Sequence, residues 1–156
     1  PYEISFSFHR NYFPYGTHTD SGYDPDEFIY KQGIIPLEVY PDKGEVYTVV
    51  FSQKCYHSAS YPSSVETIRG LKTEELEQVV GYAKESSEVS ELKKYWINDN
   101  LEERFRGFQI ELPFLWKAGD MAIWDRSHFH CSSDFKIHDI KGKVGLMWIS
   151  RRLSCK

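Results

Sequence analysis

Tyr-Gly-Thr-His-Thr-Asp-Ser-Gly, residues 15–22, places a histidine and a carboxylate, His18 and Asp20, two positions apart. In an extended segment, residues i and i+2 project from the same face, so this pair can bind one metal ion together. A second stretch, DMAIWDRSHFH at 120–130, also has the pattern of a strand and carries His128 and His130. We expect this stretch to complete the coordination sphere from the opposite side of a barrel.

Length and composition favour one β-rich domain covering residues 1–156. Aromatic residues make up 16% of the chain, with 11 Tyr and 10 Phe, a bias that favours strands over a helical bundle. The formal charge of −4 comes from 23 acidic and 19 basic residues without long blocks of one sign. This balance argues against a general nucleic-acid binder.

The cysteines and the apolar runs bear on the cellular compartment. Cys55, Cys131 and Cys155 form no C-x-x-C pair, so neither a disulfide framework nor a zinc ribbon is indicated, and a reducing cytoplasm is the simplest interpretation. No apolar run approaches the roughly 20 residues of a membrane span, and no signal peptide is recognisable. The chain begins at Pro1 inside a strand-like segment, so we allow for residues upstream.

Alternating and β-branched runs predict strands at both ends of the chain. Residues 2–8 alternate apolar and polar side chains, which predicts a half-buried strand leading towards His18. Residues 33–40 and 45–52 are joined by Pro-Asp-Lys-Gly, a turn composition that predicts a hairpin, with Pro36 at an edge or a bulge. Further strands are expected at 108–112, 121–124 and 143–150.

A helical insertion is expected between about residues 63 and 106. Leu76, Val79, Val80 and Ala83 follow helical spacing after Thr73, a suitable N-cap, and predict an amphipathic helix over 73–84. A second, weaker helical segment is indicated over 89–96. We expect the insertion to pack on the outside of the β-architecture and to supply no metal ligand.

Four stretches together resemble the Fe(II)/2-oxoglutarate-dependent oxygenase superfamily, in particular its phytanoyl-CoA-hydroxylase-like and prolyl-hydroxylase-like branches. They are YGTHTDSG (15–22), IIPLEVYPDKGEVYTVVFSQ (34–53), FLWKAGDMAIWDRSHFHCSSDF (114–135) and KGKVGLMWISRR (141–152). The resemblance implies a double-stranded β-helix, a jelly-roll or cupin-like barrel with the metal at its mouth.

The resemblance also implies the chemistry of the site. Two imidazoles and one carboxylate hold Fe(II) and leave positions open for 2-oxoglutarate and dioxygen. Decarboxylation of 2-oxoglutarate to succinate and carbon dioxide then drives hydroxylation of a substrate. On this basis His18, Asp20 and His130 are the expected ligands and catalytic residues. The family's distal histidine follows Gly119-Asp120 at a spacing that selects His130, which makes His128 a neighbour with either a structural or a substrate-facing role.

A basic residue at the start of the last strand should bind the distal carboxylate of 2-oxoglutarate. Many superfamily members use an arginine there, whereas this chain offers four candidates, namely Lys141, Lys143, Arg151 and Arg152. Lys143 heads the apolar strand and matches the lysine variant best. Because an ammonium is a point charge, a hydroxyl neighbour should assist it, and Thr48 or Tyr47 is the candidate.

Two other function classes remain open at this stage. A cupin-like metalloenzyme would use the same barrel without 2-oxoglutarate, and its main support is the absence of a definite match to the family's arginine pattern in the last strand. A non-catalytic jelly-roll binding module would make the histidine pattern coincidental.

The expected partners are a small-molecule or peptide substrate and dioxygen, with neither a membrane nor nucleic acid. The substrate and the oligomeric state do not follow from the sequence. His9, His57 and His138 have no partner at ligand spacing and are expected at the surface or in turns.

Overall fold

The chain forms a mainly β structure of two antiparallel sheets. This computed structural model describes residues 2–19, 28–42, 44–55, 79–80, 89–95 and 108–152. None of the helices in these ranges is long and apolar enough to cross a membrane. The elements in chain order are β1 (Tyr2–Asn11), β2 (Phe28–Tyr40), β3 (Tyr47–Cys55), β4 (Val79–Val80), α3 (Val89–Lys94), β5 (Ile110–Leu115), β6 (Ala122–Asp125), β7 (His128–Ser132), the 3-10 helix η1 (Phe135–His138) and β8 (Gly142–Arg152).

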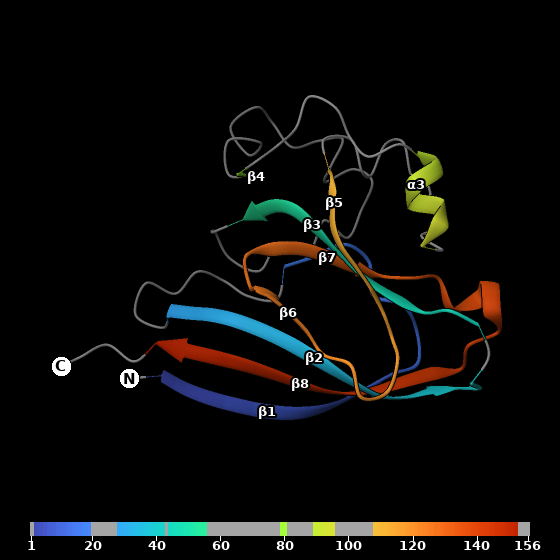
Figure 1. Cartoon of the computed structure of the whole chain (residues 1–156), viewed down its shortest axis with the longest axis horizontal. Coiled ribbons are helices and arrows are strands. Elements are labelled where there is room, and N and C mark those ends of the chain that lie inside the picture. Colours follow the sequence, from blue (N-terminus) through green and yellow to red (C-terminus); the bar gives the residue numbers. More distant parts are fainter. Residues whose placement is uncertain are drawn as a thin grey trace.

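The first sheet has the order β1-β8-β2-β6 (Figure 1). The last strand of the chain therefore lies between two strands from its beginning, and β1 pairs with β8 over its whole length. Between Pro36 and Glu38 the pairing of β2 with β8 shifts register, so the predicted bulge at Pro36 is confirmed. A proline is accommodated there because a bulge does not require its missing N–H.

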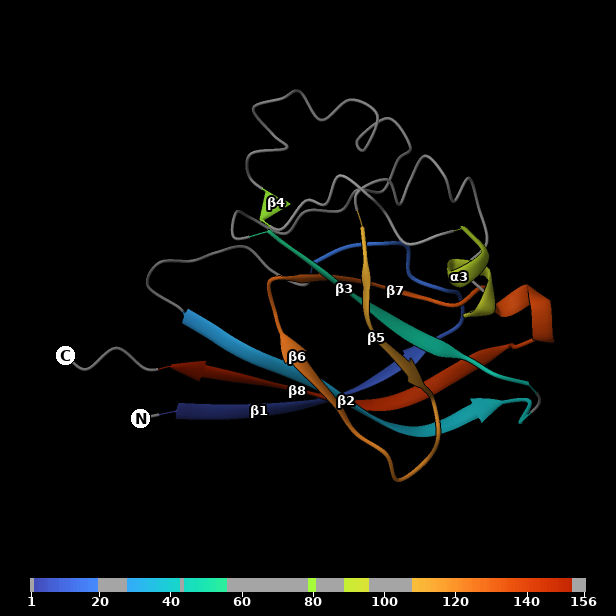
Figure 2. The same cartoon turned by 45° about the horizontal axis from the view of Figure 1, so that its top comes forward.

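The second sheet is built around β3. Its residues pair with β5 and with β7, and its last residues pair with β4. Figures 1 and 2 show this sheet lying over the first. The strands that carry His130 and Lys143, β7 and β8, thus belong to different sheets.

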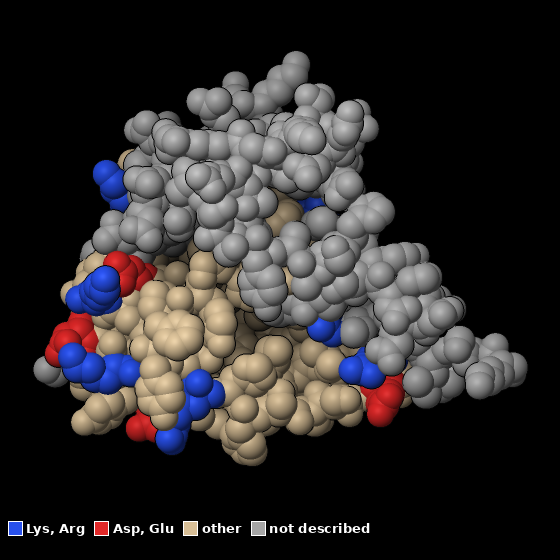
Figure 3. Space-filling model, turned by 180° about the vertical axis from the view of Figure 1, so that it is seen from behind, with Lys and Arg blue, Asp and Glu red and all other residues tan. Residues whose placement is uncertain are grey.

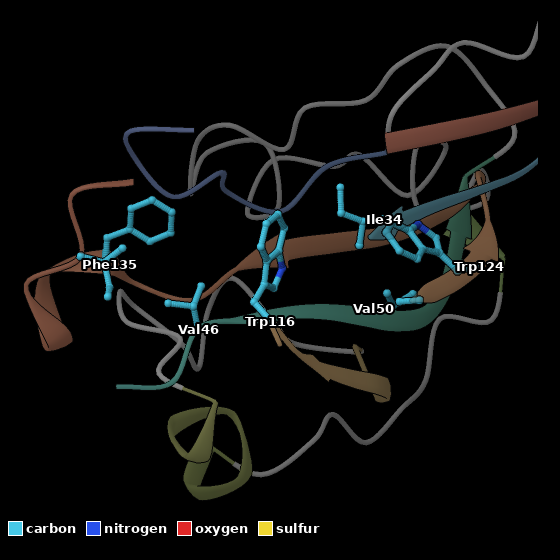
Figure 4. Packing of buried hydrophobic residues seen from close by; sticks show 8 residues of the cluster. Ile34, Val46, Val50, Trp116, Trp124 and Phe135 are labelled. Atoms are coloured by element: carbon cyan, nitrogen blue, oxygen red, sulfur yellow. The ribbon is translucent and has the colours of Figure 1, made fainter. Parts of the chain in front are cut away.

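The main core fills the space between the sheets. Ile34 of β2 and Trp124 of β6 face Val50 of β3 in one buried cluster. Figure 4 shows Trp116 in the middle of this cluster, with Phe135 on one side and Ile34 on the other. A second cluster, on the other face of β3 and β7, includes Leu92 of α3, as the predicted helical segment over 89–96 leads one to expect.

The predicted hairpin between residues 33–40 and 45–52 is wrong. Both strands exist, but β2 pairs with β8 and β6, whereas β3 pairs with β4, β5 and β7. The chain passes from one sheet to the other between Tyr40 and Tyr47, and Gly44 in this connection has a φ of 74° that favours glycine. A turn composition reverses the chain without deciding which backbone the next strand will bond to.

The predicted helix over residues 73–84 is wrong at its centre. Val79 and Val80 form β4 and pair with Cys55 and Lys54 of β3. Valines suit a strand at least as well as a helix, and the backbone groups at the end of β3 offer them partners. The other positions of the predicted stripe, including Leu76, and most of the expected insertion lie outside the described residues.

The strand predicted at residues 2–8 exists, but its apolar face is the exposed one. Tyr2, Ile4, Phe6 and Phe8 are 64%, 56%, 61% and 77% exposed. On the opposite face Ser5, His9 and Asn11 are half-buried, and His9 borders a cavity described below. Seen from behind, many of the charged side chains of the described surface gather toward the two sides, with uncharged residues between them (Figure 3).

Candidate metal centre and adjoining cavity

The fold brings His18 and His130 side by side. The two residues form an antiparallel bridge in which each backbone N–H donates to the other's carbonyl at 2.9 Å. Directly opposed residues project from the same face, and the centroids of the two imidazoles are 4.3 Å apart. The histidines are therefore cross-strand neighbours, and the expectation that they approach from opposite sides of a barrel is wrong.

Both imidazoles are oriented by backbone carbonyls. His18 Nδ1 lies 2.6 Å from the Gly16 carbonyl oxygen, and His130 Nδ1 lies 3.2 Å from that of His128. A carbonyl only accepts, so each Nδ1 is the nitrogen that carries a proton, and Nε2 is the nitrogen that could bind a metal. This arrangement is typical of metal-binding histidines, and both side chains are buried. The pair thus suits a transition metal such as Fe(II).

The third expected ligand, Asp20, lies outside the described residues. Within the described ranges there is no group of three or more His, Cys, Asp or Glu side chains that could hold a metal ion. Among the described residues, the possible metal ligands are therefore the imidazoles of His18 and His130. His18 lies two residues before Asp20. Imidazole nitrogen suits iron, copper, nickel and zinc better than it suits the oxygen-seeking magnesium or calcium.

His128 is buried among a different set of groups. Its Nδ1 lies 2.7 Å from the Phe51 carbonyl oxygen and 3.3 Å from Glu111 Oε2, while its Nε2 lies 3.8 Å from Asp125 Oδ2. It does not line the cavity that His18 and His130 border. Of the two roles considered for His128, this position matches the structural one.

A cavity of about 210 Å³ opens beside the two histidines. Its wall combines both sheets and includes side chains from β1, β2, β3, β6, β7 and β8. The lining residues are His9, Asn11, Tyr15, His18, Ile34, Thr48, Trp116, Trp124, His130, Cys131, Ser132, Lys143 and Met147. The histidines and a lysine thus share one small space.

Lys143 is almost fully buried in this cavity, at 2% exposure. Its ammonium lies 2.9 Å from Ser132 Oγ and 3.9 Å from the ring centroid of Trp116. No carboxylate among the described residues forms a salt bridge with it. Burial lowers the pKa of Lys143 to about 7, because the charged form loses its hydration. A bound anion would restore a counter-charge.

Thr48 lines the same cavity on β3. Trp116 Nε1 donates to Thr48 Oγ1 at 2.8 Å, which fixes the indole ring that lies beside the Lys143 ammonium. Neighbouring residues of a strand point to opposite faces, and the Tyr47 hydroxyl instead donates to Glu45 at 2.8 Å. Of the two hydroxyl candidates, Thr48 is therefore the one at the cavity.

Neither Lys141 nor Arg151 belongs to the cavity wall. The Lys141 side chain is 62% exposed and forms an ion pair with Asp139. Arg151 is not part of the cavity wall, and nothing is described for the side chain of Arg152. Of the three candidates whose side chains the structure describes, Lys143 is the one that borders the cavity.

Sequence reasoning missed several residues of the cavity wall. His9 was expected at the surface, yet it borders the cavity together with Asn11. A signal was present, because Ser5, Ser7, His9 and Asn11 all occupy the polar face of β1. Ser132, which accepts from Lys143, carried no such signal, because its partner is a residue on the other sheet.

No known protein-family model, curated protein or solved structure matches this chain.

Proposed function

We propose that this protein is an Fe(II)- and 2-oxoglutarate-dependent dioxygenase with a double-stranded β-helix fold. The observation that carries the proposal is that two oriented histidines and a buried lysine border one cavity. An iron site beside an anion site is the combination that a 2-oxo dicarboxylate cosubstrate requires. The overall reaction converts substrate C–H, 2-oxoglutarate and dioxygen into substrate C–OH, succinate and carbon dioxide.

The metal would be held by His18, His130 and Asp20. Carbonyl acceptors at Nδ1 fix the orientation of both rings and leave Nε2 as the ring nitrogen for the metal, so little reorganisation would accompany binding. When bound, Fe(II) with its cosubstrate and dioxygen supplies the oxidising power for attack on an unactivated C–H bond. The apolar residues around the cavity, such as Ile34 and Met147, would exclude water from the substrate.

The C5 carboxylate of 2-oxoglutarate would bind at Lys143. Its ammonium can donate to the carboxylate while it keeps its contact with Ser132, and the Thr48 hydroxyl stands near Trp116 on the same wall. A carboxylate at this position offsets the cost of a buried, uncompensated charge. The anion site and the metal site would then determine the orientation of the 2-oxo acid.

A titration of Fe(II) protein with 2-oxoglutarate under anaerobic conditions tests the proposal. Chelation of iron by the 2-oxo acid gives a metal-to-ligand charge-transfer absorbance. We expect this band in the wild type and no iron binding in His18→Ala, Asp20→Ala or His130→Ala. His128→Gln, a change outside the cavity, should keep both the iron and the band. Circular dichroism checks that each variant is folded.

Variants at Lys143 separate the two halves of the site. Lys143→Met should keep iron but weaken 2-oxoglutarate binding by about thirtyfold or more, since a buried charge-assisted contact is worth about 2–5 kcal/mol. Lys141→Met is the matched control and should bind normally. Iron binding without any charge-transfer band in the wild type would favour a cupin-like metalloenzyme. No metal binding at all would favour a non-catalytic module.

A further inference from the structure

Strand β1 has a long backbone edge at one margin of the first sheet (Figure 1). Within the described ranges, the backbone of β1 pairs with β8 alone. It is ten residues long, and its pairing with β8 runs without a register shift. The other side of an edge strand presents a regular row of N–H and C=O groups that can pair with another chain.

β1 also lacks the features that usually protect such an edge. Proteins discourage pairing at an edge with short strands, prolines, lysines or bulges. The opposite edge of the same sheet, β6, is four residues long, and β5 at the edge of the second sheet carries Pro113. Residues 2–11 contain neither proline nor lysine. Among the described edge strands, β1 is therefore the longest and the least protected.

The sequence of β1 is complementary to itself in an antiparallel arrangement. With a two-fold axis at Phe6, the two copies of Phe6 lie opposite each other. Ile4 of one copy then lies opposite Phe8 of the second copy, and Ser5 lies opposite Ser7. Directly opposed residues project from the same face. The apolar side chains therefore meet on the outer face and the serines on the other.

The charges of β1 fit the same register. Glu3 lies near the beginning of the strand, whereas His9 and Arg10 lie near its end. With the axis at Phe6, Glu3 of one copy lies directly opposite His9 of the second copy and next to Arg10. Opposite charges across a strand pair stabilise it, and by symmetry this contact occurs twice. An axis at a neighbouring serine would place Glu3 opposite an uncharged residue instead.

The outer face of β1 exposes enough apolar surface for an interface. Its side chains at positions 2, 4, 6 and 8 are 56–77% exposed and together expose roughly 500 Å², if a full side chain of this kind has about 200 Å². The largest apolar patch of a typical monomer covers about 300–600 Å² and often marks a binding surface. Edge pairing would cover part of this area on each copy, together with both backbone edges. The buried total would lie near the roughly 1,000 Å² that a specific interface needs, so we expect a dimer that dissociates in the micromolar range.

We propose that two copies of this chain pair through β1, antiparallel and about a two-fold axis at Phe6. The first sheets of the two copies, each of four strands, would then form one continuous sheet. Because His9 borders the cavity, the dimer would bring Glu3 of the second copy to the cavity wall beside it. This inference goes beyond the proposed function and requires neither iron nor 2-oxoglutarate.

Sedimentation velocity of the metal-free chain, from low micromolar to submillimolar concentrations, tests the association. We expect a reversible equilibrium between monomer and dimer. Phe6→Lys places two like charges opposite each other on the axis, so it should weaken the dimer at least tenfold. Ile123→Lys changes an exposed residue of β6, at the other edge of the sheet, and should leave the dimer unchanged. A wild type that stays monomeric, or equal weakening by the two lysines, would overturn the proposal.

Cysteine cross-linking tests the register. Opposed residues of an antiparallel pair have Cα atoms about 4.5–5.5 Å apart, which suits a disulfide, so Phe6→Cys should form a cross-linked dimer under mild oxidation. The two copies of position 8 would lie four residues apart along the strands, about 13 Å, so Phe8→Cys alone should not cross-link. A mixture of Ile4→Cys and Phe8→Cys chains should do so. The wild type controls for the native cysteines, and equal cross-linking of Phe6→Cys and Phe8→Cys would contradict the two-fold axis at Phe6.

Charge reversal provides a test that leaves the apolar face intact. Glu3→Lys should weaken the dimer about tenfold, because two attractive contacts become repulsive. Adding His9→Glu to this variant should restore most of the affinity. Circular dichroism checks the fold of every variant, and if Phe6→Lys does not fold, the Glu3→Lys pair of variants decides. A dimer that is unaffected by Glu3→Lys, or that the second substitution does not restore, would overturn the proposed pairing.

Discussion

Two lysines at the start of β8 occupy opposite environments. Lys141 is exposed beside Asp139, whereas Lys143 is buried against Trp116 and Ser132. A buried ammonium without a carboxylate partner destabilises the folded chain, because water solvates it better than an indole ring and a hydroxyl do. An anion bound in the cavity, as proposed for 2-oxoglutarate, would offset this cost.

The pH dependence of stability should reveal this cost. The pKa of Lys143 falls from an ordinary value of 10.5 to about 7 on folding. Between these pH values the unfolded chain binds one proton more than the folded chain, so the contribution of Lys143 to stability rises with pH and is most unfavourable below pH 7. Lys143→Met should therefore stabilise the protein most at low pH, and its advantage should shrink by about 1.4 kcal/mol per unit between pH 7 and 10.

Urea unfolding of both proteins at pH 6, 7.5 and 9 measures this difference. Lys141→Met serves as the control, and its effect should be small at each pH because the side chain is exposed. An effect of Lys143→Met that is the same at all three pH values would contradict a pKa of Lys143 lowered to about 7 in the folded chain.

At the scale of single elements, the alternation of apolar and polar residues in β1 correctly predicts a strand but wrongly predicts that its apolar face is buried. Its apolar side chains point outward, while His9 and Asn11 border the cavity. Phe8 is 77% exposed, so it buries little apolar surface. Phe51 of β3 is fully buried and packs edge-on against Phe108, with the ring centroids 5.4 Å apart.

Matched substitutions at the two phenylalanines test this assignment of faces. Phe8→Thr keeps a residue that favours strands and should change the free energy of unfolding by less than about 0.5 kcal/mol. Phe51→Ala should cost about 3–5 kcal/mol, because it opens a cavity in the core. Chemical unfolding monitored by tryptophan fluorescence gives both values. A loss at Phe8 comparable to that at Phe51 would place the apolar face of β1 against other residues.

At the scale of the molecule, the first sheet is completed by β8, the last described strand of the chain. β8 lies between β1 and β2, and among the described strands it is the only partner of β1. It also carries Lys143 into the cavity, so assembly of the sheet and assembly of the site depend on the same pairing.

Truncation tests this dependence. A chain ending at residue 141 lacks β8. It should fail to fold cooperatively, because the loss of β8 leaves β1 and one edge of β2 without backbone partners. Removal of residues 1–11 takes away only an edge strand, so a cooperative thermal transition should survive at a lower midpoint. Circular dichroism during heating distinguishes the two. A cooperative transition in the chain that ends at residue 141 would contradict this dependence, because it would show that the second sheet folds alone.

Much of the secondary structure could be predicted from the sequence, because alternation is a local property. The strands on either side of residues 41–44, the bulge at Pro36 and the short helix at 89–94 all follow from neighbouring residues. The helix expected around Val79 failed for the same reason, since a local pattern of valines also fits a strand that finds a partner.

The sequence by itself determined that this protein is rich in strands. It also identified His18 and His130 as candidate metal ligands and Lys143 and Thr48 as candidate anion-binding residues. Only the tertiary structure decided that His18 bridges His130, that Lys143 rather than Lys141 borders the cavity, and that β2 and β3 belong to different sheets. The physical reason is that alternation defines two faces for each strand. Which face is buried, and which backbone supplies the hydrogen bonds, depends on the partners that the whole chain brings together.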